Sequence, residues 1–235
     1  MLLYYIRHGD PTYDPDCLTP LGERQAEAIA KRLSLYGVDK IFASTSNRAK
    51  QTARPTCEIL KKDLVELDFC NEGYAWAELT VDTPYGKRWA FNYPPVMEIF
   101  ATQEVRQLGD RWYEHPELAF LKDGIDRIRR ETDSFISKLG YDHIPDTGTY
   151  KVRNSNDRRI ALFAHQGFGL AFLSCLLDIP YPMLGRHFDM THTGMTVIEF
   201  SETNGLSHPK ILTLSSDSHI YREGLPTKYN NILLF

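Results

Sequence analysis

Short apolar and β-branched runs recur along the whole chain, separated by stretches with helical spacing. Six such runs cover residues 2–6, 40–43, 64–67, 160–164, 195–200 and 210–214. The first, second and fourth are continuous rather than alternating, which is typical of strands covered on both faces in a mostly parallel sheet. The Asn204-Gly205 pair between the last two runs predicts a tight turn, and hence an antiparallel hairpin at the end of the sheet. The pattern predicts a layered α/β fold.

Helix signals lie between these runs. Thr19 followed by Pro20 predicts a helix start, because the hydroxyl can cap free amides and proline fits the first helical position. Gly37 supplies the matching stop. Further helices are expected over about residues 47–62 and from near Gly167 onward.

The stretch from about residue 73 to about residue 156 differs from the rest of the chain. It is rich in aromatic residues and prolines over 74–95, has helical patterns over 95–108 and 123–139, and ends in a polar loop over 146–156. We interpret it as an insertion, a helical and aromatic subdomain that caps the active-site end of the sheet within one domain spanning 1–235. Its aromatic residues fit a second small core at least as well as a substrate-facing lid.

Charge and composition exclude several classes of protein. The chain has 27 Lys and Arg against 31 Asp and Glu, a formal net charge of −4, and no long basic or acidic tract, so we expect no nucleic-acid or membrane partner. The opening apolar run is too short for a secretory signal, and no run of about 18 uncharged apolar residues occurs. Four scattered cysteines without a CxxC pair favour a reducing compartment. We expect a soluble, cytoplasmic protein.

Polar residues follow four of the predicted strands at the point where each strand ends. They are Arg7-His8-Gly9-Asp10, then Ser44 to Arg48, then Asn71-Glu72, and finally His165-Gln166-Gly167. Because ligands of open α/β sheets bind at the carboxyl ends of the strands, we expect these residues to converge. A lone histidine is more often structural than catalytic, but four converging strand ends are hard to reconcile with structural roles alone.

The expected set suits a phosphoryl group. The guanidiniums of Arg7 and Arg48 present forked donors that match phosphate oxygens and stay charged. A neutral imidazole can attack phosphorus and form a phosphohistidine intermediate. A carboxyl group must then protonate the leaving oxygen, and it can activate water in the second step. Glu72 is the preferred acid and Glu78 the alternative.

These residues also belong to a set of motifs with a known counterpart. The set comprises Arg7-His8-Gly9, the helix start Leu18-Thr19-Pro20-Leu21-Gly22, Ser44…Arg48-Ala49…Gln51-Thr52-Ala53 and the strand-ending His165. Together they resemble the histidine phosphatase superfamily, which has the phosphoglycerate mutase-like fold. The resemblance extends from Leu2 to about Phe200, most of the chain.

The resemblance implies a three-layer α/β/α sandwich with a mostly parallel central sheet, in which His8 is the phosphorylated nucleophile. Arg7, Arg48 and His165 would complete the phosphate pocket. The proton donor would come from the loop after the third strand, where Asn71-Glu72 is similar to the donor-bearing pair of the mutase branch. The candidates for substrate contact are Arg7, Arg48, His165, Gln166, Gly9 and Asp10.

We therefore predict a metal-independent phosphomonoesterase that acts on a small phosphate ester and needs no cofactor. Phosphoglycerate mutase-type transfer is an alternative, disfavoured by the short segment between Asp10 and the helix start. Gln166 stands where many relatives have glycine, which weakens any transfer of backbone contacts there. A non-catalytic module that binds a phosphorylated ligand is a second alternative.

Several residues near this set have competing interpretations. A metal hydrolase using His8, Asp10 and His165 is disfavoured, since neighbouring arginines repel a cation. Asp10 is more often a turn former in such a context. His192 could approach the pocket, although a structural role fits it better. The aromatic residues of 74–93 could stack on a ring or line an apolar site, and the pattern ranks no leaving group and no oligomeric state.

Overall fold

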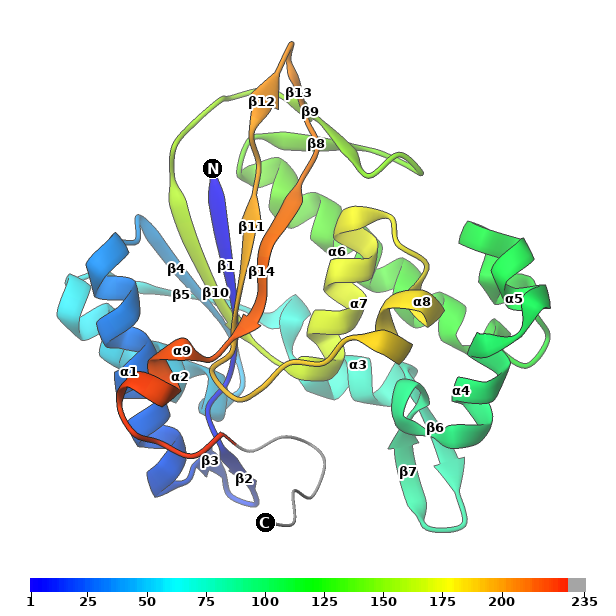
Figure 1. The fold of residues 1–235 in the computed structure, drawn as a ribbon, viewed down its shortest axis with the longest axis horizontal. Helices are drawn as coiled ribbons and strands as arrows, with labels where there is room; N and C mark the ends of the chain where they lie inside the picture. The colour runs from blue at the N-terminus through cyan, green and yellow to red at the C-terminus, as the bar shows by residue number, and fades with distance from the viewer. Residues whose placement is uncertain (228–235) are drawn as a thin grey trace.

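A six-stranded sheet forms the centre of the protein, as the computed structural model shows for residues 1–227 (Figure 1). Its strands are β1 (Leu2–Arg7), β4 (Lys40–Ser44), β5 (Leu64–Leu67), β10 (Arg159–Ala164), β11 (Met195–Glu199) and β14 (Lys210–Ser216). The strand order is β14-β11-β1-β10-β4-β5. β1, β10, β4 and β5 pair in parallel, whereas β11 pairs antiparallel with both β1 and β14, so only β11 runs against the others in this sheet. The predicted mostly parallel sheet is confirmed.

Helices cover both faces of the sheet. The helices α1 (Pro20–Tyr36) and α2 (Asn47–Leu60) share one core cluster with Tyr4 and Ile6 of β1. On the other face, α6 (Lys122–Lys138) and α7 (Gln166–Leu177) share a core cluster with Leu3 and Tyr5. Alternate residues of β1 thus enter opposite cores, which explains why its sequence is apolar throughout.

The helix α1 begins and ends where the sequence predicts. The Thr19 hydroxyl accepts a hydrogen bond from the Gly22 amide at 3.1 Å, and Gly37 follows the last turn at φ 73°. The amide of Gly37 still donates to the Leu33 carbonyl at 3.0 Å, so this carbonyl in the last turn of the helix has a hydrogen-bond partner. The positive φ is the conformation that glycine adopts without steric cost.

The segment between β5 and β10 contains several smaller elements. They are α3 (Glu72–Glu78), β6 (Thr80–Thr83), β7 (Gly86–Trp89), α4 (Pro94–Ala101), α5 (Gln103–Leu108), α6, β8 (Tyr141–Ile144), β9 (Thr149–Val152) and the 3-10 turns Asp68–Cys70, Ala90–Asn92, Gly109–Glu114 and Ala119–Leu121. Buried Phe100 and Trp112 of this segment lie in the same core cluster as Leu3 and Leu162 of the sheet. Its buried aromatic residues therefore extend the main core, whereas Trp76 and Tyr85 remain exposed.

The expected polar loop over 146–156 is wrong in part, because its middle forms β9. This strand pairs antiparallel with β8 and with β13 (Leu206–Ser207), and β12 (Glu202–Thr203) completes a four-stranded sheet. Tyr150 of β9 is fully buried, and its hydroxyl donates to the Leu176 carbonyl at 2.8 Å. The few apolar residues among polar neighbours gave too weak an alternation to reveal a strand.

The remaining elements lie before α1 and after α7 in the sequence. They are the hairpin of β2 (Pro11–Tyr13) and β3 (Asp16–Leu18), the helix α8 (Tyr181–His187) and the helix α9 (Ser218–Arg222). All four cysteines are free thiols. Within residues 1–227, no helix combines the length and apolar character needed to cross a membrane.

Candidate active site

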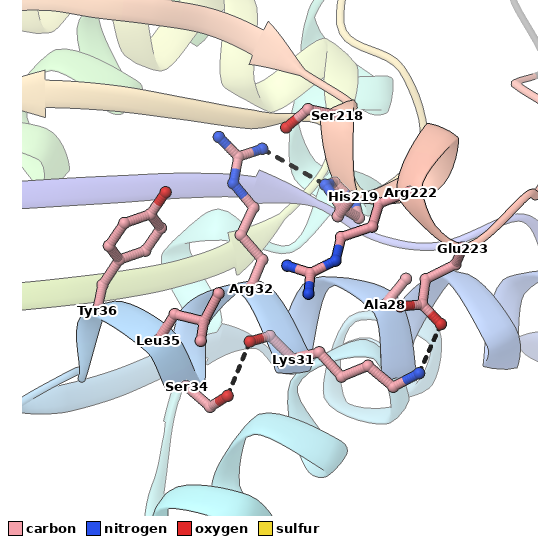
Figure 2. A pocket seen from close by; sticks show the side chains of 10 residues that line it. All are labelled: Ala28, Lys31, Arg32, Ser34, Leu35, Tyr36, Ser218, His219, Arg222 and Glu223. Atoms are coloured by element: carbon pink, nitrogen blue, oxygen red, sulfur yellow. Dashed lines mark hydrogen bonds and ion pairs between the residues drawn. The ribbon is translucent and has the colours of Figure 1, made fainter.

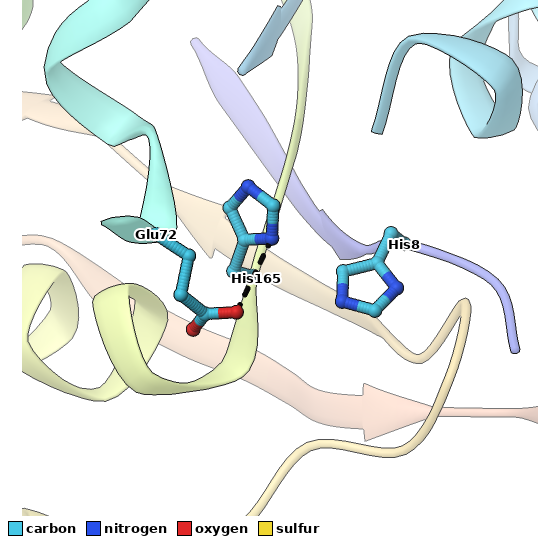
Figure 3. Close-up of side chains that lie close together, drawn as sticks. All are labelled: His8, Glu72 and His165. Atoms are coloured by element: carbon cyan, nitrogen blue, oxygen red, sulfur yellow. Dashed lines mark ion pairs between the residues drawn. The ribbon is translucent and has the colours of Figure 1, made fainter. Parts of the chain in front are cut away.

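The two histidines predicted to converge lie side by side at the carboxyl edge of the sheet. His8 follows β1 and His165 follows β10, and because these strands are parallel neighbours both residues leave the sheet at the same edge. The two rings have their centroids 5.2 Å apart at an angle of 61°. Figure 3 shows Glu72 on the far side of His165, so that the three side chains form one group.

The ring of His8 is oriented by a backbone carbonyl. Its Nδ1 lies 2.7 Å from the Gly9 carbonyl oxygen, which can only accept, so Nδ1 carries the proton and Nε2 keeps its lone pair. His8 is 1% exposed. Burial lowers its pKa well below the usual value, and the nearby His165, Arg7 and Arg48 lower it further. A neutral imidazole with a free Nε2 is the form that acts as a nucleophile.

Both ring nitrogens and the backbone carbonyl of His165 have hydrogen-bond partners. Its Nε2 lies 2.8 Å from the hydroxyl of Ser44 and 3.2 Å from that of Ser46, while its Nδ1 lies 3.1 Å from Arg48 Nη2. The Tyr5 hydroxyl donates to the His165 carbonyl at 2.6 Å. Burial lowers the His165 pKa, although Glu72 acts in the opposite direction. The ring is therefore a fixed polar group beside His8.

Glu72, rather than Glu78, is the carboxylate that the fold brings to the histidines. Its Oε1 accepts from the Gly167 amide at 2.8 Å, and its Oε2 lies 3.3 Å from His165 Nδ1 and 3.5 Å from Arg48 Nη2. Burial alone would raise the Glu72 pKa, but the nearby His165 ring and the guanidiniums of Arg48 and Arg7 outweigh it and hold the pKa at about 2. Glu78 points elsewhere, because Arg127 binds both of its oxygens at 2.7–2.9 Å.

Two buried guanidiniums complete the group. Arg48 is anchored by Asp16, whose Oδ1 accepts from its Nη1 at 2.8 Å, and Arg7 donates to the Met190 carbonyl. The Nε atoms of both arginines are buried without a hydrogen-bond partner among the described residues. Buried donors without acceptors are costly, so both guanidiniums keep unused capacity to donate hydrogen bonds.

Three further residues predicted to contact substrate make contacts within the protein. Gly9 donates its amide to the Thr52 hydroxyl at 2.9 Å. Asp10 Oδ2 accepts from the Thr19 hydroxyl at 2.7 Å, which ties it to the start of α1, and its Oδ1 lies 3.6 Å from His192 Nδ1. Gln166 donates to Asp189. Their contact with substrate stays a prediction.

The loop after β1 and the first turn of α1 come so close together that a side chain at Gly9 would collide with the backbone of Gly22. A Cβ at Gly9 would lie 2.7 Å from the carbonyl oxygen of Gly22, and a Cβ at Gly22 would lie 2.1 Å from the carbonyl oxygen of Asp10. The loop after β1 and the first turn of α1 thus touch directly. The two glycines of the sequence motif therefore fix the position of His8.

His8, Glu72 and His165 also offer three ligand atoms that all lie within 4.8 Å of one another, a spacing that a metal ion could bridge. The charge around them opposes this. Arg48 Nη2 lies 3.1 Å from His165 Nδ1 and 3.5 Å from Glu72 Oε2, the atoms such an ion would need. Two guanidiniums beside three ligands favour an anion over a cation.

Some residues around the group were not singled out from the sequence. Asp16 and Tyr13 come from the β2–β3 hairpin, and the Tyr13 ring lies 5.2 Å from the guanidinium of Arg48. His192, in contrast, was named from the sequence as a residue that could approach the pocket, and its ring lies 5.7 Å from the His8 ring. A short hairpin before a helix carries no periodic signal that would have marked Asp16 or Tyr13.

A second hollow of about 360 Å³ lies between α1 and α9, away from the histidine group (Figure 2). Two of its charged side chains have partners within the protein: Lys31 pairs with Glu223 at 2.5 Å, and Arg32 donates to the Ser216 hydroxyl at 3.0 Å. His219 in this wall is 3% exposed, and burial together with Arg32 lowers its pKa to about 4. The paired charges make this hollow a weaker candidate than the group around His8.

The sheet and the group at its edge define an α/β protein with a buried site of two histidines, two arginines and one carboxylate. Residues 3–116 match the family model of the histidine phosphatase superfamily (branch 1), so this part of the chain is similar to that superfamily. The predicted resemblance is thus confirmed. No curated protein matches the sequence.

Solved structures of phosphatases share the fold. A phosphoserine phosphatase from Entamoeba histolytica has 18% identity and a TM-score of 0.60, with 93% of this chain and 98% of that chain covered. A mycobacterial glucosyl-3-phosphoglycerate phosphatase has 16% identity and a TM-score of 0.58, covering 92% and 98%. A protein described as mycobacterial hydrolase 1 has 17% identity and a TM-score of 0.59, covering 92% and 98%. These similarities confirm the three-layer α/β fold.

Proposed function

We propose that the protein is a metal-independent phosphomonoesterase that works through a phosphohistidine on His8. The observation that carries the proposal is the hydrogen bond from His8 Nδ1 to the Gly9 carbonyl, which leaves Nε2 as the nucleophilic atom. Arg7 and Arg48 supply the charge to bind a phosphoryl dianion. Preorganised donors stabilise the charge that develops on phosphoryl oxygens in the transition state.

The reaction would take place in two steps. In the first, His8 Nε2 forms a bond to phosphorus while the bond from phosphorus to the ester oxygen breaks, and Glu72 gives that oxygen a proton. In the second, water attacks phosphorus and passes a proton to Glu72 as the bond between nitrogen and phosphorus breaks. Inorganic phosphate leaves, and both side chains return to their starting states.

Glu72 can act as the acid only after it gains a proton, since its pKa of about 2 leaves it ionised in the free protein. That low pKa has its origin in the hydrogen bond with His165 and in the positive charges of Arg48 and Arg7. A phosphate bound to the arginines offsets these charges and so raises the Glu72 pKa. The monoanion of a phosphate ester also brings a proton into the site.

The substrate class we propose is a small phosphorylated metabolite. Two of the structural neighbours are described as phosphatases of phosphoserine and of glucosyl-3-phosphoglycerate, both phosphate monoesters of small molecules. The cavity beside Glu72 has a volume of about 640 Å³, which lies within the usual range for small-molecule sites.

The test is hydrolysis of 4-nitrophenyl phosphate in the presence of a chelator across pH ~5 to 8. We expect the native protein to release phosphate and His8→Ala to lose turnover, because the variant lacks the imidazole proposed to form the phosphorylated intermediate. An exposed histidine outside the site serves as the control, and His208→Ala should retain full activity. Acid-labile, alkali-stable labelling by a radioactive phosphate ester should appear in the native protein only.

Other outcomes would favour other functions. Phosphate exchange between phosphoglycerates with little free phosphate released would indicate a mutase. Loss of activity in the chelator, restored by a divalent cation, would indicate a metal hydrolase. Thermal stabilisation by phosphate esters without turnover of any of them would indicate a binding module.

A further inference from the structure

The cavity of about 640 Å³ opens directly beside the group around His8. Ser46, Arg48 and Glu72 belong to both. The rest of its wall consists of Tyr13, Asp16, Asn71, Gly73, Trp76 and Trp89. An ester oxygen that receives a proton from Glu72 must lie next to this space, so the leaving group would extend into it.

The indole of Trp76 is positioned to contact such a leaving group. Trp76 follows Glu72 by four residues on α3, so both side chains lie on the same face of that helix. Trp76 is 38% exposed. Its ring meets that of Trp89 edge to face, with the centroids 5.0 Å apart at 83°. An apolar surface therefore begins about one helical turn from the proposed acid.

Trp89 is fixed behind this surface. A Cβ at Gly167 would lie 2.5 Å from Cζ2 and Cη2 of Trp89, so only glycine lets the indole come this close to the start of α7. The Gly167 amide is the group that donates to Glu72 Oε1. Phe91 stacks on Trp89 with the centroids 5.5 Å apart at 24°. The wall is thus rigid and packed against the proposed acid.

The charges of the cavity disfavour an anionic leaving group. Of the described residues that line it, Arg48 is the only cation, and it is bound to Asp16 at 2.8 Å. Asp16 and Glu72 place two carboxylates in the same wall. A carboxylate on the leaving group would lack a free cation and would be repelled by both.

A cationic leaving group fits less well than an uncharged ring. Recognition of a quaternary ammonium needs open aromatic faces around the charge. Here the Arg48 guanidinium already lies 5.2 Å from the Tyr13 ring centroid, and Phe91 covers Trp89. The surface left for a ligand is a flat apolar one, centred on Trp76.

We propose, on the basis of the phosphatase function above, that the preferred substrates are monophosphate esters whose leaving alcohol carries a planar, uncharged ring. The ring packs against Trp76 with Trp89 behind it, while the phosphoryl group lies at His8. Phosphorylated carboxylic acids are poor substrates, which separates this chain from neighbours described as acting on phosphoserine or glucosyl-3-phosphoglycerate.

The experiment compares four esters of primary alcohols, so that the chemistry of the leaving oxygen stays similar. They are benzyl phosphate, ethyl phosphate, phosphoserine and phosphocholine. We expect kcat/KM for benzyl phosphate to exceed that for each of the others by about 10-fold, as the stacking of rings on aromatic side chains predicts. Trp76→Ala should lower the ratio of benzyl to ethyl phosphate by about 10-fold, and Trp76→Phe should restore part of it.

The control is Tyr85→Ala. Tyr85 lies in the turn between β6 and β7, on the hairpin that carries Trp89; its side chain is 87% exposed and does not line the cavity. This variant should leave all four values unchanged. A second measurement avoids turnover by using the His8→Ala variant and measuring the binding of benzyl phosphate by calorimetry. We expect the double variant His8→Ala/Trp76→Ala to bind benzyl phosphate about 10-fold more weakly than His8→Ala alone.

Preference for phosphoserine or phosphocholine, or an unchanged ratio in Trp76→Ala, would overturn the leaving-group proposal while leaving the phosphatase function standing. Hydrolysis of none of the esters, with 4-nitrophenyl phosphate also inert, would instead refute the phosphatase function. In that case equal binding of benzyl and ethyl phosphate by calorimetry would refute the ring contact as well.

Discussion

A buried histidine away from the group around His8 should make the protein less stable as the pH becomes alkaline. His143 of β8 has both ring nitrogens bonded to carboxylates, Nδ1 to Asp133 and Nε2 to Asp178, each at 2.9 Å. Its side chain is 2% exposed and stacks on Tyr150 with the centroids 4.7 Å apart. Two carboxylate acceptors require both nitrogens to carry protons, so the folded state holds the imidazolium.

The size of the effect follows from the pKa. Burial alone would lower the His143 pKa, but the hydrogen bonds to Asp133 and Asp178 outweigh it and raise the pKa to about 9. The unfolded value is about 6.5, so the difference is about 2.5 pH units, or about 3 kcal/mol of unfolding free energy. Since the folded pKa is raised, this stabilisation is complete below pH ~6.5 and is lost as pH rises through about 9.

The assay is urea denaturation at a series of pH values from about 6 to about 9.5 for the native protein and for His143→Gln. The variant keeps a hydrogen-bonding side chain but carries no charge. We expect the native protein to lose about 3 kcal/mol more than the variant over this interval. Groups other than His143 titrate in both proteins, so the difference between the two curves isolates its contribution.

Parallel pH curves for the two proteins would refute this reasoning, because they would show that His143 is neutral in the folded state at pH 6. Asp133→Asn provides an independent check if His143→Gln does not fold. It removes one of the two negative charges that raise the His143 pKa, so the alkaline loss of stability should shift to lower pH. An unchanged curve for Asp133→Asn would contradict the assignment of the imidazolium to this ion pair.

Two predictions concern catalysis. Glu72→Gln should lower the rate of ethyl phosphate hydrolysis by about 10²–10⁴-fold if Glu72 is the acid. Glu78→Gln should leave the rate nearly unchanged, because Glu78 forms an ion pair with Arg127 away from the histidines. The reverse result would assign the role of the acid to Glu78. Because the His8 pKa lies well below its usual value, kcat/KM corrected for ionisation of the substrate should show no loss near pH ~6.5 as pH falls. An acid limb at that pH would show that His8 titrates like an exposed histidine.

The sheet and its flanking helices could be predicted because their physical signals are local. Continuous apolar runs marked β1, β4 and β10, and a threonine cap followed by proline marked the start of α1. The strand β9 escaped notice, because its stability comes from Tyr150 buried against α7 and from pairing with β13, about fifty residues later. Only the tertiary structure creates that environment.

The group around His8 could be predicted because topology alone brings its residues together. Parallel strands place His8, Arg48, Glu72 and His165 at one edge of the sheet whatever the loops between them do. The choice between Glu72 and Glu78 was left open by the sequence, since it depends on the ion pair that Arg127 of α6 makes with Glu78. Such a partner across 49 residues leaves no pattern in the sequence.

The wall for the leaving group has a different physical origin. Trp76 lies on a short helix and Trp89 on a hairpin, and the position of Trp89 depends on Gly167, whose missing Cβ admits the indole. The sequence marked Gly167 as the expected start of a helix after a strand end, whereas the structure shows that it also accommodates a tryptophan. The sheet edge and this wall share Glu72, whose Oε1 accepts hydrogen bonds from the amides of Gly167 and Phe168. Substitutions in the hairpin can therefore change the leaving group that is accepted while the residues proposed to act on phosphorus stay in place.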